Sequence, residues 1–162
     1  MKELDIYIAI EGPIGVGKTS LAELIADKLN ARKVFEKFEE NPFLKDFYDD
    51  PESNAFQTQI FFLLQRYQQQ QKDIRQLNVL QKGVVTDYMF EKDRLFADFT
   101  LNSEAEFKLY SHVADILEKD IVKPDLVVYL QADTPRLMKN IKKSCLLYTS
   151  PSPRDQRGSR MP

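Results

Sequence analysis

The sequence predicts an α/β fold in which a parallel sheet is flanked by helices on both faces. Short apolar segments rich in β-branched residues alternate with longer segments of helical periodicity. This alternation is typical of βαβ units, whose crossover helices cover both faces of a parallel sheet. With 162 residues, 43% of them hydrophobic, the chain is long enough for one domain with a sizeable core.

The composition argues against several classes of protein. The formal net charge of −2 does not suit a protein whose main partner is a nucleic-acid polymer or an anionic membrane surface. No apolar run approaches the roughly 18 residues that a membrane-spanning helix needs. Cys145 and His112 are the only cysteine and histidine, so a disulfide framework or a Cys/His metal centre is not expected. We therefore expect a cytoplasmic protein without a membrane partner.

The first half of the chain is predicted to hold two strands and two helices. Residues 6–10 form an almost continuous apolar run, as in a strand buried on both faces. Residues 20–30 place leucine and isoleucine at helical spacing, and residues 34–35 are predicted as a short second strand. Residues 55–71 are predicted as a long helix with a very apolar middle.

The second half continues the alternation of strands and helices. The expected elements are a strand at 83–87, helices at 94–99 and 104–119, and a strand at 124–130. Thr134 and Pro135 suit the N-cap and first position of a helix, so a final helix is expected to begin there.

Residues 12–19 carry a phosphate-binding motif. Their sequence, Gly-Pro-Ile-Gly-Val-Gly-Lys-Thr, fits G-x-x-x-x-G-K-[ST] and lies between a predicted strand and a predicted helix. The glycines let backbone amides approach phosphate oxygens, and the helix N-terminus adds positive potential. Lys18 is expected to reach the β- and γ-phosphates, and Thr19 to ligate Mg²⁺. The residues expected to bind the nucleoside triphosphate are Gly12, Gly15, Val16, Gly17, Lys18, Thr19 and Ser20.

Three segments together resemble the deoxynucleoside kinases. They are residues 8–19, residues 35–44 around Glu36, and residues 56–63. Within the family the chain is most similar to the bacterial deoxyadenosine/deoxyguanosine kinase group, from about residue 6 to residue 143. The resemblance implies a P-loop kinase fold and transfer of the γ-phosphate of ATP, with Mg²⁺, to the 5′-hydroxyl of a small-molecule deoxynucleoside. It also implies a homodimer formed through helices that flank the sheet.

The resemblance assigns catalytic roles to individual residues. Glu36 matches the general base for the 5′-hydroxyl, and Asp87 matches an acidic residue near Mg²⁺ and that hydroxyl. Lys18 completes the expected catalytic set. Glu39 and Glu40, in the same acidic loop as Glu36, are interpreted as solvated charges.

The expected substrate contacts begin on the long helix. Gln59 and Arg66 lie seven residues apart on one helix face, and a polar pair on a buried face needs partners. The matching family positions bind the base, with Gln57 as the alternative to Gln59. Tyr48 matches a residue that holds the sugar 3′-hydroxyl. Asp93 matches a residue facing the base, where an aspartate favours adenine or cytosine and leaves guanine open.

The chain departs from the family pattern after the predicted strand at 83–87. Tyr88 and Met89 stand where the family has arginine and serine, so the cation expected to clamp the transferring phosphate is missing. Lys92 is the candidate substitute, and a solvated surface lysine is the alternative interpretation.

A second departure follows residue 143, where the family has an arginine-rich lid. Residues 144–162 match no part of that lid, and residues 145–155 and 159–162 back-translate to DNA that resembles a sequencing adaptor. We therefore interpret residues 1–143 as an incomplete kinase domain and residues 144–162 as a disordered, non-native tail. On this interpretation the chain as written binds nucleotide weakly and turns over poorly.

Three other functions remain open from the sequence. One is another P-loop kinase, such as a nucleoside monophosphate kinase. The second is a nucleotide-dependent switch or binding module that hydrolyses slowly, although no separate switch element is evident. The third is an inactive fragment that keeps the phosphate loop.

Overall fold

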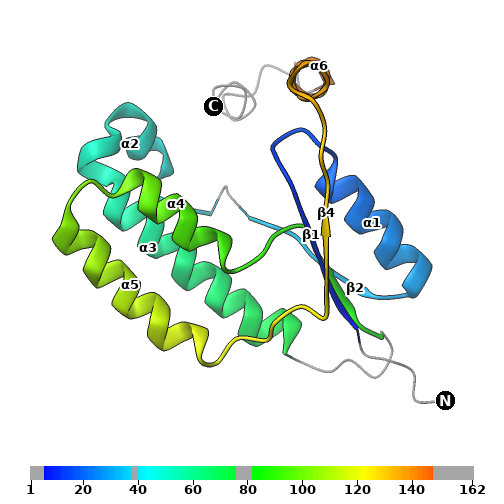
Figure 1. Ribbon diagram of the computed structural model, residues 1–162, viewed down its shortest axis with the longest axis horizontal. Helices are drawn as coiled ribbons and strands as arrows, with labels where there is room; N and C mark the ends of the chain where they lie inside the picture. Colours follow the sequence, from blue (N-terminus) through cyan, green and yellow to red (C-terminus); the bar gives the residue numbers. More distant parts are fainter. Residues whose placement is uncertain (1–5, 38–39, 76–81, 148–162) are drawn as a thin grey trace.

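The computed structural model describes residues 6–37, 40–75 and 82–147, which are built around a four-stranded sheet (Figure 1). Every strand pairing is parallel, and the strand order is β2-β3-β1-β4. The strands are β1 (Tyr7–Glu11), β2 (Arg32–Val34), β3 (Val84–Thr86) and β4 (Leu126–Tyr129). The parallel sheet confirms the predicted α/β class.

The helices follow the predicted alternation, with one addition. They are α1 (Lys18–Leu29), α2 (Leu44–Asp49), α3 (Pro51–Gln69), a π-helical turn η1 (Gln70–Ile74), α4 (Lys92–Thr100), α5 (Glu104–Glu118) and α6 (Thr134–Leu147). Side-chain caps typical of helix N-termini begin α3 and α5, among others. Asp50 accepts a hydrogen bond from the Ser53 amide at the start of α3, and Ser103 accepts one from the Glu106 amide at the start of α5.

Apolar side chains cover both faces of the sheet at its inner strand β1. On one face Ile8 and Ile10 of β1 pack against Ala22 and Ala26 of α1. On the other face Tyr7 and Ala9 of β1 pack in a cluster that includes Ile74 of η1 and Tyr88. A strand that buries side chains on both faces must be apolar throughout, which explains the continuous run at residues 6–10.

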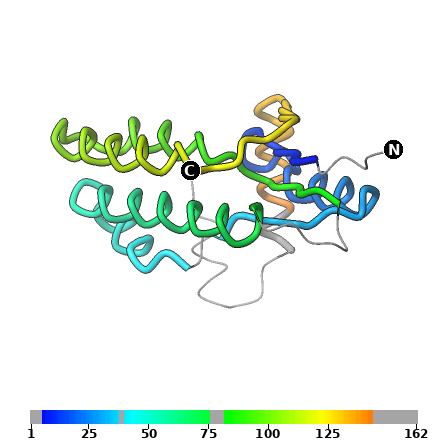
Figure 2. The backbone as a smooth tube through the Cα atoms, turned by 90° about the horizontal axis from the view of Figure 1, so that it is seen from below, coloured from blue at the N-terminus to red at the C-terminus, as the bar shows by residue number. Residues whose placement is uncertain are grey.

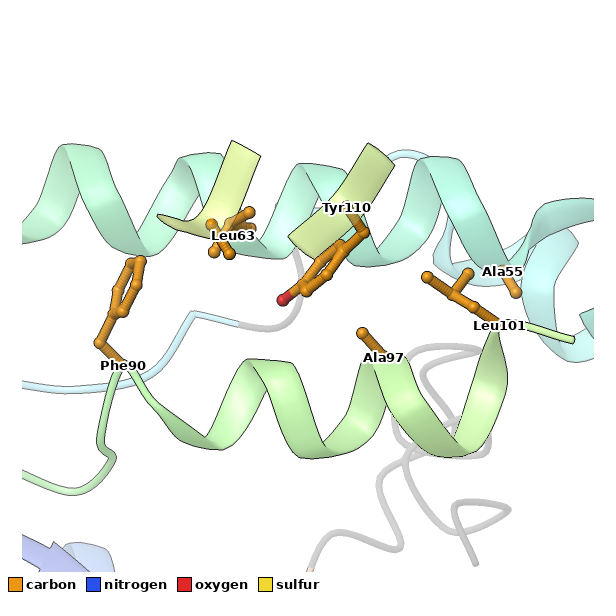
Figure 3. Packing of buried hydrophobic residues seen from close by; sticks show 7 residues of the cluster. Ala55, Leu63, Phe90, Ala97, Leu101 and Tyr110 are labelled. Carbon is orange, nitrogen blue, oxygen red and sulfur yellow. The ribbon is translucent and has the colours of Figure 1, made fainter. Parts of the chain in front are cut away.

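A second core lies away from the sheet, between α3, α4 and α5. Figure 2 shows these helices side by side, extending beyond the strands. Leu63, Phe90, Ala97 and Tyr110 converge at their centre (Figure 3). This helical layer holds α3 and α4 in fixed positions relative to each other, so polar residues on the two helices keep a fixed separation.

Two elements differ from the prediction in the first half of the chain. Helix α2 was not predicted, because its six residues include none that is buried and therefore show no apolar periodicity. Strand β2 ends at Val34, whereas a strand at 34–35 was predicted. Its pairing with β3 runs from Arg32 opposite Val84 to Val34 opposite Thr86, and Phe35 lies beyond the paired segment.

Helix α6 differs from the prediction at both ends. The carboxylate of Asp133 accepts a hydrogen bond of 3.0 Å from the Arg136 amide, so Asp133, and not Thr134, is the N-cap. The predicted boundary after residue 143 lies inside α6, which continues to Leu147 because no proline or glycine interrupts it. The rest of the predicted tail, residues 148–162, lies outside the described residues.

Among the described residues, none of the helices combines the length and the apolarity needed to cross a bilayer.

Candidate active site

The loop between β1 and α1, residues 12–17, has a backbone that admits an anion. Gly12 and Gly15 have φ values of 151° and 81°. A Cβ atom on Gly12 would lie 2.7 Å from the carbonyl oxygen of Leu130, so only glycine fits there. Helix α1 starts directly after this loop with no side-chain cap at Gly17. The first amides of α1 therefore have no side-chain acceptor at the cap. Amides of this kind at a helix N-terminus are suited to bind an anion such as a phosphate.

Lys18 lies across the opening of this loop. Its Nζ donates a hydrogen bond of 2.7 Å to the carbonyl oxygen of Gly12. Burial lowers the pKa of Lys18, and the positive charge of Lys92 lowers it further. The ammonium group is thus placed where the loop meets β1, next to a second cationic side chain.

Helix α6 braces the outer side of the same loop. Asn140 Nδ2 donates a hydrogen bond of 2.8 Å to the carbonyl oxygen of Gly15. A Cβ atom on Gly15 would lie 2.9 Å from the side chain of Ile141, so the helix packs directly on the loop. Figure 1 shows α6 at the end of the sheet where the loop lies.

Asp87 connects chain segments that follow three different strands. Its Oδ2 accepts a hydrogen bond of 2.7 Å from Thr19 Oγ1, and its Oδ1 accepts one of 2.9 Å from the Glu36 amide. Carboxyl ends of parallel strands meet at one edge of a sheet, where ligands bind in α/β folds. Burial raises the pKa of Asp87, and the hydrogen bond from Thr19 opposes this effect. Thr19, Glu36 and Asp87, all predicted as site residues, are therefore brought together.

The oxygen atoms of Thr19 and Asp87 fit Mg²⁺ in chemical type. Mg²⁺ prefers hard oxygen ligands and is usually held by one or two protein groups together with nucleotide phosphates. Among the described residues there is no cluster of three or more His, Cys, Asp or Glu side chains that could hold a metal by itself. A metal here would accordingly share its ligands between the protein and a nucleotide.

Arg66 of α3 joins two acidic residues that are distant in sequence. Its guanidinium forms ion pairs with Glu36, in the loop after β2, and with Asp93 of α4. The guanidinium also lies 5.4 Å from the ring centroid of Phe62 and 5.5 Å from that of Tyr88. Burial lowers the pKa of Arg66 to about 10, so the group remains charged at neutral pH. Arg66 therefore fixes the Glu36 carboxylate relative to the helical layer.

The two candidate glutamines of α3 lie in different surroundings. Gln59 is 6% exposed and, among the described residues, its amide has no hydrogen-bond partner. Gln57 instead donates hydrogen bonds to Asn54 and to the carbonyl of Ser53 within its own helix. Of the two, Gln59 is therefore the buried one whose amide forms no hydrogen bond within the described part of the chain. Tyr48, on α2, is 37% exposed.

Lys92 lies next to the phosphate loop and is paired. Its Nζ is 3.0 Å from Glu11 Oε1, at the end of β1, and 5.5 Å from the ring centroid of Phe96. Glu11 Oε2 also accepts a hydrogen bond of 3.1 Å from the Gly12 amide. Lys92 is therefore part of a partly buried ionic contact at the start of the loop.

Sequence reasoning did not find four polar residues that shape this site. They are Glu11, Gln69, Tyr88 and Asn140. Glu11 had a usable signal, because an acidic residue that ends a strand buried on both faces is unusual. The others form contacts across 19 to 125 positions of sequence. Tyr88 was noted only as a departure from the family pattern, and nothing in the local pattern marks Gln69 or Asn140.

Comparisons with known proteins agree with this geometry. A family model described as "Deoxynucleoside kinase" matches residues 8–148. The chain is 38% identical over 139 residues to a deoxyguanosine kinase of Bacillus subtilis (strain 168), and 35% identical over 140 residues to a deoxyadenosine kinase of Dictyostelium discoideum. A solved structure of deoxyadenosine kinase from M. mycoides with bound dATP is similar with a TM-score of 0.70 and 25% sequence identity.

The matches cover most of this chain and a smaller part of its relatives. The match to the Bacillus subtilis protein takes in 85% of this chain and 66% of that protein, and the match to the Dictyostelium protein takes in 84% and 56%. The match to the solved structure covers 85% of this chain and 71% of the other. The chain thus spans between about half and two thirds of the length of these curated relatives.

Proposed function

Because the chain belongs to the deoxynucleoside kinase family, we propose that it transfers the γ-phosphoryl group of ATP to the 5′-hydroxyl of a deoxynucleoside. The observation that carries this proposal is the junction at Asp87, which connects Thr19 of the phosphate loop to the backbone of Glu36. The junction places a phosphate cradle and a carboxylate at the same edge of the sheet. That is the arrangement an in-line transfer between a triphosphate and an alcohol requires.

The donor side of the reaction is assigned to residues 12–20. The loop amides and Lys18 bind the phosphates of ATP, and Thr19 with Asp87 would hold Mg²⁺. When bound, the metal neutralises charge on the phosphate oxygens. Lys92 is proposed to face the transferring phosphate in place of the missing family arginine. Its position beside Lys18 and Glu11 supports this assignment.

The acceptor side is assigned to the Glu36 carboxylate. Glu36 accepts the proton of the 5′-hydroxyl while that oxygen attacks the γ-phosphorus, and the bond to the bridging oxygen of ADP breaks. Arg66 supports this role, because a guanidinium beside the carboxylate stabilises its charged form and orients it. Positioning and charge neutralisation provide most of the rate in phosphoryl transfer.

The base of the nucleoside is assigned to buried polar residues of α3 and α4. Gln59, Arg66 and Asp93 are buried polar residues that can offer both donors and acceptors to a base edge. The carboxylate of Asp93 would accept from an exocyclic amine, which favours deoxyadenosine or deoxycytidine and leaves deoxyguanosine as the next candidate. Tyr48 is proposed to contact the sugar 3′-hydroxyl.

The proposal extends to a homodimer formed through α4. Leu95, Phe96 and Phe99 are 63%, 47% and 82% exposed on this helix. Apolar side chains that gather on one exposed face indicate an interaction surface.

Substitution of Glu36 tests the catalytic assignment. Glu36→Gln keeps the size of the side chain but cannot take the proton, so the rate of phosphoryl transfer should fall by about 10²-fold or more. The rate is measured with radiolabelled ATP against deoxyadenosine, deoxyguanosine, deoxycytidine and thymidine, and ATP binding is measured by calorimetry. ATP affinity should remain within about twofold, because the phosphate loop is unaltered.

Glu40→Gln is the matched control for this substitution. Glu40 lies in the same acidic loop, where it is exposed and contacts Lys37 and Gln65. Its substitution should leave the transfer rate unchanged. Equal rates for Glu36→Gln and the unsubstituted chain would contradict the proposal. Transfer to nucleoside monophosphates, but not to nucleosides, would instead identify a monophosphate kinase.

A further inference from the structure

The peptide group that joins Phe35 to Glu36 is held at both of its polar ends. Its carbonyl oxygen accepts a hydrogen bond of 2.9 Å from Gln69 Nε2, and its N–H donates one of 2.9 Å to Asp87 Oδ1. Gln69 is the last residue of α3, whereas Asp87 directly follows β3. A planar peptide that is bound on both sides cannot rotate freely, so these contacts set the direction in which the Glu36 side chain leaves the backbone.

Gln69 is in turn held by Tyr88. The Tyr88 hydroxyl donates a hydrogen bond of 2.7 Å to Gln69 Oε1. Tyr88 and Gln69 are 1% and 9% exposed, so water does not readily replace either contact. Burial raises the pKa of Tyr88, which keeps the hydroxyl protonated and able to donate. With its oxygen bound to Tyr88, the Gln69 amide must present its NH₂ group to Phe35.

The hydrogen bonds act on Glu36 from a different side than Arg66 does. Arg66 contacts the carboxylate itself, at the far end of the side chain. The Tyr88–Gln69 contacts act on the backbone next to the Glu36 Cα atom. To accept a proton from an alcohol that attacks a phosphate, a carboxylate must be held in a fixed position. A displacement of about 1 Å can cost up to about 10²-fold in rate, so both ends of the Glu36 side chain need to be fixed.

We propose that Gln69 and Tyr88 are positioning residues that fix the Phe35–Glu36 peptide and thereby aim the Glu36 carboxylate into the active site. This inference rests on the proposed function of Glu36. The two residues lie on α3 and after β3, so they also link the position of Glu36 to the packing between the helical layer and the sheet.

A matched pair of tyrosine substitutions tests the inference. Tyr88→Phe removes the hydroxyl that binds Gln69. Tyr110→Phe removes a buried hydroxyl that has no hydrogen-bond partner among the described residues. Gln69→Leu removes both contacts of the amide at similar side-chain volume. Hydrogen exchange of the Glu36 amide is followed by NMR in the full 162-residue chain.

The exchange rate at Glu36 is expected to rise about tenfold in both variants, because Gln69→Leu removes one anchor of the peptide and Tyr88→Phe releases the amide that forms this anchor. The rate should not change in Tyr110→Phe, and amides of α5 should exchange at their original rates in all three variants. Unchanged exchange at Glu36 in both Tyr88→Phe and Gln69→Leu would overturn the inference, whatever the activity of the chain.

Kinetics provide a second readout that separates positioning from folding. In Gln69→Leu, kcat is expected to fall about tenfold while KM for ATP stays within about twofold. A raised KM with unchanged kcat would overturn the inference. If the unsubstituted chain transfers phosphate to no deoxynucleoside, the proposed function fails, and the exchange measurement still decides whether Gln69 and Tyr88 hold the peptide.

Discussion

At the scale of single residues, the buried carboxylate of Asp87 accepts two hydrogen bonds at once, from Thr19 and from the Glu36 amide. Both contacts are strongest when the group is ionised. Burial nevertheless opposes ionisation and raises the pKa of Asp87 above its ordinary value of 3.8. The carboxylate is therefore held charged at a cost in stability, as is common where function requires a buried charge.

This cost predicts a pH dependence of stability. The folded chain binds the Asp87 proton more tightly than the unfolded chain, so the free energy of unfolding falls as the pH rises from about 4 through the raised pKa. Asp87→Asn removes the titrating group. The free energy of unfolding of the variant minus that of the unsubstituted chain should therefore increase across this interval. Urea unfolding from about pH 4 to about pH 7 measures it, and a difference independent of pH would contradict the prediction.

At the scale of elements, the phosphate loop depends on α6 as well as on its own glycines. Asn140 binds the Gly15 carbonyl, and Ile141 leaves no room for a side chain at Gly15. Gly17 has a similar backbone conformation, with φ of 99°, but a Cβ atom there would meet no neighbour within 4 Å. A comparison of substitutions at the two glycines therefore distinguishes two costs. Backbone strain is common to both positions, whereas packing against α6 affects Gly15 alone.

Alanine substitutions at the two glycines should differ in their effect on stability. Each places a side chain in the left-handed region, which costs about 1–2 kcal/mol. Gly15→Ala should cost about 1–3 kcal/mol more, because the new methyl group pushes against Ile141 and the Leu137 carbonyl. Urea unfolding of both variants gives the comparison. A larger loss for Gly17→Ala than for Gly15→Ala would show that α6 does not pack on the loop.

At the scale of the whole molecule, α4 is one of the elements that carry several exposed apolar side chains. Phe99 is the most exposed large hydrophobic residue among those described, and Leu95 and Phe96 lie on the same short helix. The opposite side of α4 buries Asp93 and Ala97 against α3 and α5. Apolar side chains left exposed on a helix whose other side is already packed indicate an interaction surface, which supports the proposed dimer contact.

The dimer proposal predicts a change of mass on substitution. Phe99→Glu should convert a dimer into a monomer of 18.9 kDa, measured by light scattering after size-exclusion chromatography. Leu64→Glu is the matched control, because Leu64 is also an exposed apolar residue but lies on α3. The control should keep the mass of the unsubstituted chain. Equal masses for Phe99→Glu and the unsubstituted chain would argue against α4 as the interface.

Much of the fold could be predicted because its signals are local. The strands buried on both faces need continuous apolar runs, and the phosphate loop needs glycines and a lysine at fixed spacing before a helix. Helix α2 has neither kind of signal, and the end of β2 depends on its register with β3. Such boundaries are set by hydrogen bonds to a distant segment, which a local pattern does not contain.

The sequence by itself determined the α/β class, the phosphate loop, and the candidacy of Glu36 and Asp87 at the ends of strands. Only the tertiary structure distinguished buried Gln59 from Gln57, and only it placed Lys92 against Glu11 and Gln69 against Phe35. The physical reason for this difference is the sequence separation of the residues that form each feature. Helical periodicity and backbone turns arise among neighbours, whereas these polar contacts exist only after the sheet and the helical layer have packed together.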